Sequence, residues 1–287
     1  MSIEVRDLSH IYMEGSPFQS IALSHINVTI EDGELIGLIG HTGSGKSTFV
    51  QHLNALLKPT SGQIFVDGLE LFHEGTNLRD VRRKVGLVFQ YPEYQLFEET
   101  VEKDIAFGPK NLGLSDAEAL ERAKEAAALV GLSDSLLTRS PFELSGGQKR
   151  RVAIAGVLAM HPNILILDEP AAGLDPSGRR DMLKLLKKLH ADGERTLLMV
   201  SHSMTDVATL CKRVLVMNKG AIAMDGAPGD IFSQAEDLMQ MGLGLPAAAQ
   251  LCHALRAEGF SDIPEGLWRM EDVESAILAS LKGGASK

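Results

Sequence analysis

Gly40-His41-Thr42-Gly43-Ser44-Gly45-Lys46-Ser47-Thr48 fits the pattern G-x-x-x-x-G-K-[ST], and this stretch decides the fold class. A continuous apolar run over residues 35–39 precedes it and predicts a strand that is buried on both faces. A helix is predicted directly after it, over residues 47–57. Glycines between a strand and a helix let backbone N–H groups converge on phosphate oxygens, and the helix start adds a positive dipole. The sequence therefore predicts a phosphate-binding loop.

Two side chains of this loop and two later carboxylates are expected to do the chemistry. Lys46 would reach the β- and γ-phosphates of ATP, and Ser47 would ligate Mg²⁺. A second buried strand, predicted over residues 164–168, ends at Asp168 and is followed by Glu169. Beside a phosphate loop, the first carboxylate is placed to hold Mg²⁺ or its waters, and the second to polarise the attacking water as a general base. A solvated turn is the alternative for this pair.

The hydrophobic pattern of the whole chain predicts an α/β fold. Alternation at residues 3–6 and 26–30 is typical of half-buried antiparallel strands, and residues 63–66 with the turn Asp67-Gly68 begin a hairpin. Elsewhere buried strands alternate with helices, which indicates a mostly parallel sheet. The predicted buried strands span residues 35–39, 85–89, 164–168, 196–201 and 213–217. The predicted later helices span residues 117–130, 149–159, 177–190, 236–241, 246–258 and 271–281.

The composition limits the classes of function. The chain has 287 residues and a formal net charge of −10, which argues against a protein that coats nucleic acid. Its cysteines, Cys211 and Cys252, form no CxxC pair, so neither a disulfide framework nor a zinc site is expected. The N-terminus shows no secretory signal, and no apolar run approaches the roughly 20 residues of a membrane span. A role in a membrane process would therefore need a partner.

A second phosphate-type motif lies far from the first. Leu144-Ser145-Gly146-Gly147-Gln148 precedes the helix predicted over residues 149–159, with Ser145 near its N-cap. A serine and two glycines before a helix form a second anion-binding helix start, and one nucleotide does not need two. The simplest hypothesis is a head-to-tail pair of chains, in which this motif meets the γ-phosphate held by the partner's loop. A flexible loop that only caps a helix is the alternative.

Together these motifs resemble the ATP-binding-cassette (ABC) ATPase family. The glycine loop is similar to its Walker A motif, residues 164–169 to its Walker B motif with the catalytic glutamate, and residues 144–148 to its signature motif. The motifs also follow the family's order, over about residues 2–232. The resemblance implies a P-loop NTPase of ABC type with a mostly parallel sheet and an antiparallel β lobe. It also implies a division into an ATPase domain (1–232), with a helical subdomain inserted at 91–160, and a small C-terminal helical dimerisation domain (233–287).

The resemblance further implies roles for single residues. Gln90 matches the glutamine that senses Mg²⁺ and the attacking water, and His202 matches the histidine that contacts the γ-phosphate. Asp175 matches the D-loop, and Tyr12 stands where the family stacks an aromatic ring on adenine. The catalytic residues expected are Glu169, His202 and Gln90, and the Mg²⁺ ligands are Ser47, Gln90 and Asp168. The nucleotide contacts expected are Tyr12, Gly40, His41, Thr42, Gly43, Ser44, Gly45, Lys46, Ser47, Thr48, Ser145, Gly146, Gly147, Gln148 and Asp175.

A finer resemblance begins after Gln90. Tyr91-Pro92-Glu93-Tyr94-Gln95-Leu96-Phe97 and Phe107-Gly108-Pro109-Lys110-Asn111 are similar to the second ATPase type of energy-coupling-factor (ECF) transporters. These are prokaryotic importers of vitamins and of cobalt or nickel, in which two related ATPases serve a transmembrane coupling protein and a small substrate-capture membrane protein. Tyr91, Tyr94, Leu96 and Phe97 cluster directly after Gln90, so we expect residues 91–97 to dock on the transmembrane coupling protein. A loop whose aromatic side chains pack on the helical subdomain is the alternative.

The sequence thus predicts an ATP-hydrolysing subunit, with ATP and Mg²⁺ as ligands, that powers an ECF importer from the cytoplasmic face of a prokaryotic membrane. Its expected cassette partner is a related ATPase or a second copy, and nucleic acid is not an expected partner. The alternatives are the ATPase of a conventional ABC transporter and a soluble ABC protein acting on ribosomes or DNA. A single cassette without sustained heptads disfavours the soluble protein. Cobalt, nickel, biotin, riboflavin and folate all remain open as substrates.

Overall fold

The computed structural model describes residues 2–191, 193, 195–264 and 266–284. The first part of the chain contributes an antiparallel sheet of four strands. Its order is β2-β1-β4-β5. Both segments with alternating hydrophobicity lie in it, and Asp67 and Gly68 make the turn of the hairpin with positive φ angles. The predicted antiparallel β lobe is therefore confirmed. Its strands are β1 (Ile3–Tyr12), β2 (Ser20–Ile30), β4 (Ser61–Val66) and β5 (Leu69–Glu70).

The second sheet has six strands in the order β10-β9-β3-β8-β7-β6. The strands from β9 to β6 run parallel to their neighbours, and only the edge strand β10 is antiparallel. Because parallel strands are covered on both faces, every residue of β3, β6, β7 and β8 is buried. The predicted parallel sheet is confirmed. Its strands are β3 (Leu35–Gly40), β6 (Val85–Val88), β7 (Ile164–Asp168), β8 (Thr196–Val200), β9 (Arg213–Asn218) and β10 (Ala221–Gly226).

Two apolar clusters cover the two faces of the parallel sheet. Alternate residues of β3 divide between them, as the twofold period of a strand requires. Ile36 and Leu38 pack with the antiparallel sheet and α1 (Lys46–Leu53), whereas Leu35 and Ile39 pack with the helices of the other face. The carboxyl ends of β3, β6, β7 and β8 meet at one edge of the sheet, where α/β folds place their ligands.

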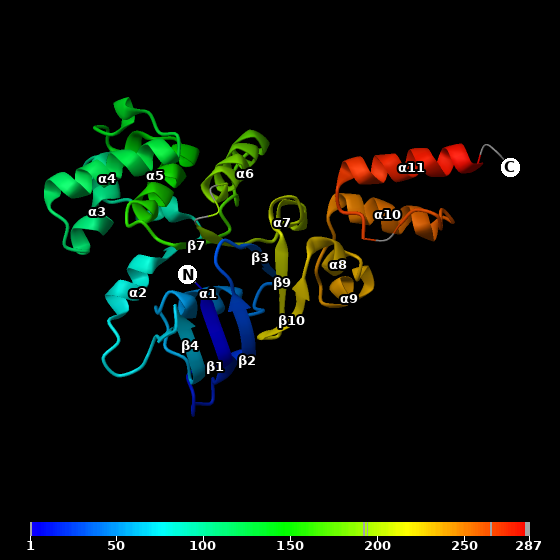
Figure 1. Cartoon of the computed structure of the whole chain (residues 1–287), viewed down its shortest axis with the longest axis horizontal. Helices are drawn as coiled ribbons and strands as arrows, with labels where there is room; N and C mark the ends of the chain where they lie inside the picture. Colours follow the sequence, from blue (N-terminus) through cyan, green and yellow to red (C-terminus); the bar gives the residue numbers. More distant parts are fainter. Residues whose placement is uncertain (1, 192, 194, 265, 285–287) are drawn as a thin grey trace.

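Most of the helices between β5 and β9 lie in two groups (Figure 1). The ribbon shows α3, α4 and α5 gathered on one side of the molecule, away from β1 and β2, while α6 and α7 lie over the middle of the parallel sheet. Ser115 and Ser145 start α4 and α5 with capping boxes. The bounds are α2 (Leu78–Lys84), η1 (Pro92–Gln95), α3 (Val101–Asn111), α4 (Asp116–Leu129), η2 (Asp134–Leu136), η3 (Pro141–Glu143), α5 (Gly146–Leu158), α6 (Pro176–His190) and α7 (Met204–Leu210).

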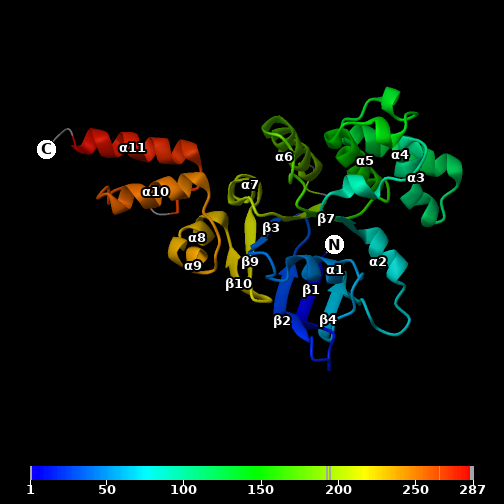
Figure 2. The ribbon, with the colours of Figure 1, turned by 180° about the vertical axis from the view of Figure 1, so that it is seen from behind.

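Beyond β10 the described residues form four helices. They are α8 (Pro228–Phe232), α9 (Ala235–Gln240), α10 (Ala247–Ala257) and α11 (Met270–Gly284). Figure 2 shows α10 and α11 side by side, at the opposite end of the molecule from α3 and α4. Cys252 and Val273 join these two helices in a small apolar cluster of their own. None of the helices in the described ranges combines the length and the apolar character that a membrane span requires. The division at residue 232 into two domains stays a prediction.

Boundaries differ from the sequence-based prediction chiefly at α1. The helix ends at Leu53, not at residue 57, because Asn54 leaves the helical conformation and Ala55 adopts a left-handed φ of 55°. Helix α3 was not predicted, because Gly108 and Pro109 interrupt its hydrophobic pattern. A Cβ at Gly108 would lie 3.0 Å from the Met160 Cγ, so a larger residue there would displace the Met160 side chain slightly.

Candidate active site

The phosphate loop leaves β3 and enters α1 through backbone positions that only glycine fits. Gly45 is the N-cap of α1 with a φ of 102°, and a Cβ there would lie 2.5 Å from the Ala22 carbonyl oxygen. A Cβ at Gly40 would lie 2.5 Å from the Met217 carbonyl oxygen. The close approach of the loop to β2 and β9 therefore explains the glycines at these two positions. Because the N-cap Gly45 has no side chain, the backbone N–H groups at the start of α1 have no side-chain cap.

Lys46 lies beneath this loop. Its Nζ donates to the carbonyl oxygens of Gly40 and His41, over 2.6 and 3.0 Å. Burial lowers the pKa of the Lys46 ammonium, although the nearby carboxylates Glu169 and Asp168 act in the opposite direction. A buried ammonium whose hydrogen bonds go to uncharged oxygens, the two carbonyls and, at 3.5 Å, the Ser44 Oγ, is well suited to receive phosphate oxygens.

Ser47 and Asp168 bring two oxygen donors together, from the first turn of α1 and the end of β7. The Ser47 Oγ donates to the Asp168 Oδ2 over 3.2 Å. Burial raises the pKa of Asp168, more than the Ser47 hydrogen bond and Lys46 lower it. No cluster of three His, Cys, Asp or Glu side chains suited to a metal occurs in the described part of the chain. A hydroxyl and one carboxylate fit Mg²⁺, which takes its other ligands from phosphates and water.

Glu169 presents an unused carboxylate oxygen to the same place. Its backbone has a φ of 52°, and its Oε1 is buried without a hydrogen-bond partner among the described residues. Burial first, and then the Asp168 carboxylate, raise the pKa of Glu169 to about 7. A carboxylate with a pKa near neutrality and a free oxygen is suited to take a proton from water.

His202 approaches the same oxygen from the end of β8. Its Nε2 lies 3.5 Å from the Glu169 Oε1. Burial, followed by the charge of Lys46, lowers the pKa of His202, which disfavours the charged ring that an ion pair with Glu169 would need. The arrangement places a carboxylate and an imidazole around one point, where a water and a γ-phosphate would meet.

Two salt-bridged residues that sequence reasoning missed join α6 to the helix that follows His202. Arg179, on α6, donates to both carboxylate oxygens of buried Asp206 on α7, over 2.8 and 3.0 Å. Helix α7 follows His202 directly, and α6 begins at its N-cap Asp175, whose Oδ1 accepts from the Gly178 N–H. The starts of α6 and α7, next to Asp175 and His202, are therefore tied together. The only signal in the sequence is the acidic residue in the first turn of α7.

A cleft of about 430 Å³ unites most of the predicted site residues, and this volume is typical of small-ligand sites. Tyr12 stands at its wall, and the Tyr12 hydroxyl lies 3.2 Å from the Thr48 Oγ1. Gly40, His41 and Ser44 belong to the loop but do not line the cleft. The predicted residues that line it are Tyr12, Thr42, Gly43, Gly45, Lys46, Ser47, Thr48, Gln90, Asp168, Glu169 and His202.

The signature motif lies outside this cleft. Ser145 caps α5 by accepting from the Gln148 N–H, while the Gln148 Oε1 accepts from the Ser145 N–H. A Cβ at Gly146 or Gly147 would meet nothing within 4 Å, so this helix start is open to another molecule. Neither this motif nor Asp175 lines the cleft of its own chain.

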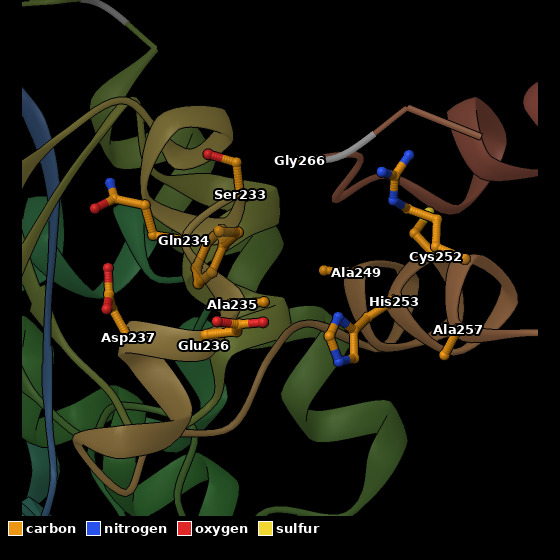
Figure 3. Close-up of a pocket in the computed structure, with 12 residues that line it drawn as sticks. Ser233, Gln234, Ala235, Glu236, Asp237, Ala249, Cys252, His253, Ala257 and Gly266 are labelled. Atoms are coloured by element: carbon orange, nitrogen blue, oxygen red, sulfur yellow. The ribbon is translucent and has the colours of Figure 1, made fainter. Parts of the chain in front are cut away.

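A second hollow, of about 510 Å³, lies among the C-terminal helices (Figure 3). Glu236 and Asp237 from α9 and His253 from α10 surround it. No phosphate-binding motif lies beside it, and none of the residues predicted for catalysis lines it. The cleft at the phosphate loop is therefore the candidate active site.

Replacing Lys46 by Ala is expected to weaken ATP binding by roughly 10- to 100-fold, since a charged hydrogen bond to phosphate is lost. Titration of a fluorescent ATP analogue against the folded variant measures this. Glu169→Gln is the matched comparison, because its side chain lies in the same cleft but is expected to leave affinity unchanged. Equal affinities of the unaltered chain and Lys46→Ala would contradict the assignment of Lys46.

Comparison with known proteins identifies the family. The model of the ABC transporter family matches residues 23–172. The energy-coupling factor transporter ATP-binding protein EcfA2 of Clostridium perfringens is 54% identical over 98% of this chain and 99% of its own length. The structure of cbiO1 from Clostridium perfringens, part of the ABC transporter complex cbiONQ, is 37% identical, with a TM-score of 0.73 over 88% of this chain and 98% of that one. A dimeric ATP-binding cassette bound to ADP and Pi is 28% identical, with a TM-score of 0.70 over 78% of this chain and 98% of that one. The chain therefore belongs to the ABC transporter family, among the energy-coupling factor transporter ATP-binding proteins.

Proposed function

We propose that this chain is the ATP-hydrolysing subunit of an energy-coupling-factor importer of micronutrients, such as vitamins, cobalt or nickel. One observation carries the proposal. The cleft that joins Lys46, Asp168, Glu169 and His202 occurs in a chain similar to EcfA2 proteins over nearly its full length. A soluble ABC protein on ribosomes or DNA, and a conventional ABC transporter, do not account for that full-length likeness.

The proposed reaction uses each side chain for one task. Tyr12 stacks on adenine, and Lys46 holds the β- and γ-phosphates. Mg²⁺, bound through Ser47 and Asp168 and sensed by Gln90, would neutralise phosphate charge. Glu169 takes a proton from water while the water oxygen bonds to the γ-phosphorus, and the bond from that phosphorus to the β–γ bridging oxygen breaks. His202 donates to the γ-phosphate, and the products are ADP and phosphate.

The proposed working unit is a head-to-tail pair of ATPases. The signature motif supports this, because its open helix start lies outside the cleft of its own chain. A similar cassette bound to ADP and Pi is dimeric, which supports it further. The partner is a related ATPase or a second copy, and we propose that residues 233–287 help the pair associate.

The segment of residues 91–97, called the docking segment below, is the proposed contact with a transmembrane coupling protein. Tyr91, Tyr94 and Phe97 are 42%, 84% and 56% exposed, whereas Leu96 is 9% exposed and belongs to the core. Leu96 therefore does not contribute to the contact surface. The Phe97 ring stands edge-on to the Phe107 ring, with centroids 4.9 Å apart.

Phe107 also lines a neighbouring groove and thereby extends the proposed surface. The groove has a volume of about 550 Å³. Its lining is largely apolar, with Leu56, Phe89 and Leu112, and also contains Arg79, Arg82 and Arg83. Exposed aromatic rings beside an apolar groove are typical of a protein interface. We propose that the coupling protein covers both, at the cytoplasmic face of a prokaryotic membrane. The substrate-capture protein would contact this chain only indirectly.

Transport by the assembled complex tests the proposed function. The complex is isolated through a tag on this chain and reconstituted in liposomes, with the ATPases facing the added ATP. Labelled cobalt, nickel, biotin, riboflavin and folate are then offered in turn. ATP-dependent movement of one of these probes across the membrane is expected. Vigorous ATP hydrolysis by a chain that never associates with a membrane protein would contradict the proposal.

The double replacement Tyr94→Ser with Phe97→Ser is expected to abolish copurification with the coupling protein and ATP-driven uptake. Loss of two aromatic anchors, at about 2 kcal/mol or more each, lowers affinity by roughly a thousandfold. Phe18→Ser is the matched control, because Phe18 is also exposed, at 77%, on the turn between β1 and β2. ATP binding should survive both changes. Normal uptake by the double variant would place the contact elsewhere, and its unfolding would make these rings part of the core.

A further inference from the structure

A single buried guanidinium joins three separate segments of this chain. Arg150 lies on α5, the helix capped by Ser145, and its side chain is only 2% exposed. Its Nε and Nη2 donate to the two carboxylate oxygens of Glu93, over 3.1 and 2.8 Å. Its Nη1 donates to the carbonyl oxygens of Pro170 and Ala172, over 3.1 and 2.6 Å. All three nitrogens of the guanidinium are therefore used.

Each end of this network belongs to a segment with a separate task. Glu93 lies in the docking segment, beside exposed Tyr94. The two carbonyl groups lie in the loop that leads from Glu169 to Asp175. In that loop the Ala172 N–H also donates to the Glu169 carbonyl oxygen, over 3.1 Å. The guanidinium thus connects the proposed membrane contact to the backbone of the proposed catalytic base.

A second contact links the same two segments. Tyr91 opens the docking segment with a left-handed φ of 53°. A Cβ placed on Gly173 would lie 3.7 Å from the Tyr91 Cε1, so the ring lies against the loop between Glu169 and Asp175. The docking segment and this loop therefore touch directly, as well as through Arg150.

We propose that Arg150 is a positioning residue through which docking of the membrane partner sets the rate of ATP hydrolysis. The inference rests on the proposed function, which supplies the partner. A guanidinium holds its donors in a rigid fork, so Glu93 cannot move away from α5 without straining the bonds to Pro170 and Ala172. A buried charge also resists separation from its counter-charge. Displacement of the docking segment is therefore transmitted to the Glu169 loop.

The test compares two ATPase rates for each variant. One rate is measured on the full complex in nanodiscs, and the other on the ATPase pair without membrane proteins. Arg150→Lys keeps the charge but loses the fork. Arg151→Lys is the matched control, because Arg151 donates to the Val130 carbonyl oxygen and, among the described residues, makes no hydrogen bond to the docking segment. Glu93→Gln is the second variant, since it keeps the shape of the side chain and removes its charge.

The unaltered chain and Arg151→Lys are expected to show rates that differ at least about threefold between complex and isolated pair. For Arg150→Lys and Glu93→Gln, the ratio of the two rates should fall to about one. General destabilisation would lower both rates together and leave their ratio unchanged. The inference would be overturned if folded Arg150→Lys kept the ratio of the unaltered chain. If Arg150→Lys does not fold, the same result for Glu93→Gln would overturn it. Equal rates of the unaltered chain in the complex and in the isolated pair would also overturn it. Failure of the unaltered chain to assemble with membrane proteins would instead count against the proposed function.

Discussion

Glu169→Gln is expected to lower ATP turnover by a factor of about 10²–10⁴ while ATP still binds, because the amide cannot accept a proton from water. The carboxylate has a buried Oε1 that accepts no hydrogen bond from the described part of the chain, and its pKa is raised to about 7, first by burial and then by Asp168. Both features suit a general base, and glutamine preserves the shape of the side chain. Single-turnover hydrolysis with excess enzyme measures the chemical step, and binding of a fluorescent nucleotide measures affinity.

Two comparison variants separate catalysis from binding. His202→Ala is expected to resemble Glu169→Gln, with slow hydrolysis and retained binding, since His202 also lies in the cleft. Lys46→Ala is expected to lose affinity instead. A single-turnover rate for Glu169→Gln within about threefold of the unaltered chain would remove Glu169 from the role of base.

Ser145→Arg is expected to abolish hydrolysis at the partner's site and to leave ATP binding to its own chain intact. A long cationic side chain would occupy the open helix start where the partner's γ-phosphate is expected. Because Ser145 does not line the cleft of its own chain, the nucleotide bound there should be unaffected. Hydrolysis is measured in a pair that combines Ser145→Arg in one ATPase with an unaltered partner, and affinity is measured on the isolated variant.

Loss of the helix cap is a separate effect that needs its own control. Removing a serine cap costs about 0.5–2 kcal/mol of stability. Ser115→Arg removes an equivalent capping box, with Glu118 at the start of α4, without touching the signature motif. This control should lose similar stability and retain hydrolysis. If Ser145→Arg weakens ATP binding in the isolated chain, Ser145 serves its own nucleotide and the head-to-tail pair is wrong.

Most of the cleft was predictable because its chemistry is local in the sequence. The phosphate loop needs glycines at Gly40 and Gly45 for steric reasons, and such requirements leave a readable pattern. Gln90, Asp168 and His202 lie at or just beyond the carboxyl ends of β6, β7 and β8. A parallel sheet brings such ends to one edge, so the topology alone predicts that these side chains meet.

The residues that position the site were not predictable from the sequence. Arg150 and Glu93 are 57 positions apart, and Arg179 and Asp206 are 27 apart, so no spacing rule pairs them. Buried arginine is rare, and Arg150 stands in a charged run that is typical of a solvated helix face. The burial of Leu96 was likewise not predictable, because the sequence of an apolar cluster in a loop does not show which of its side chains is buried in the core.

Affinity purification of this chain from its native membranes, in mild detergent, tests most directly whether it powers an energy-coupling-factor importer. Mass spectrometry of the purified material should find a related ATPase, a transmembrane coupling protein and a small membrane protein that captures the substrate. ATP hydrolysis by this material should depend on Glu169. The membrane proteins should be absent when the purified chain carries Tyr94→Ser and Phe97→Ser. Recovery of the unaltered chain with ribosomal or DNA-bound proteins, and without any membrane protein, would contradict the assignment.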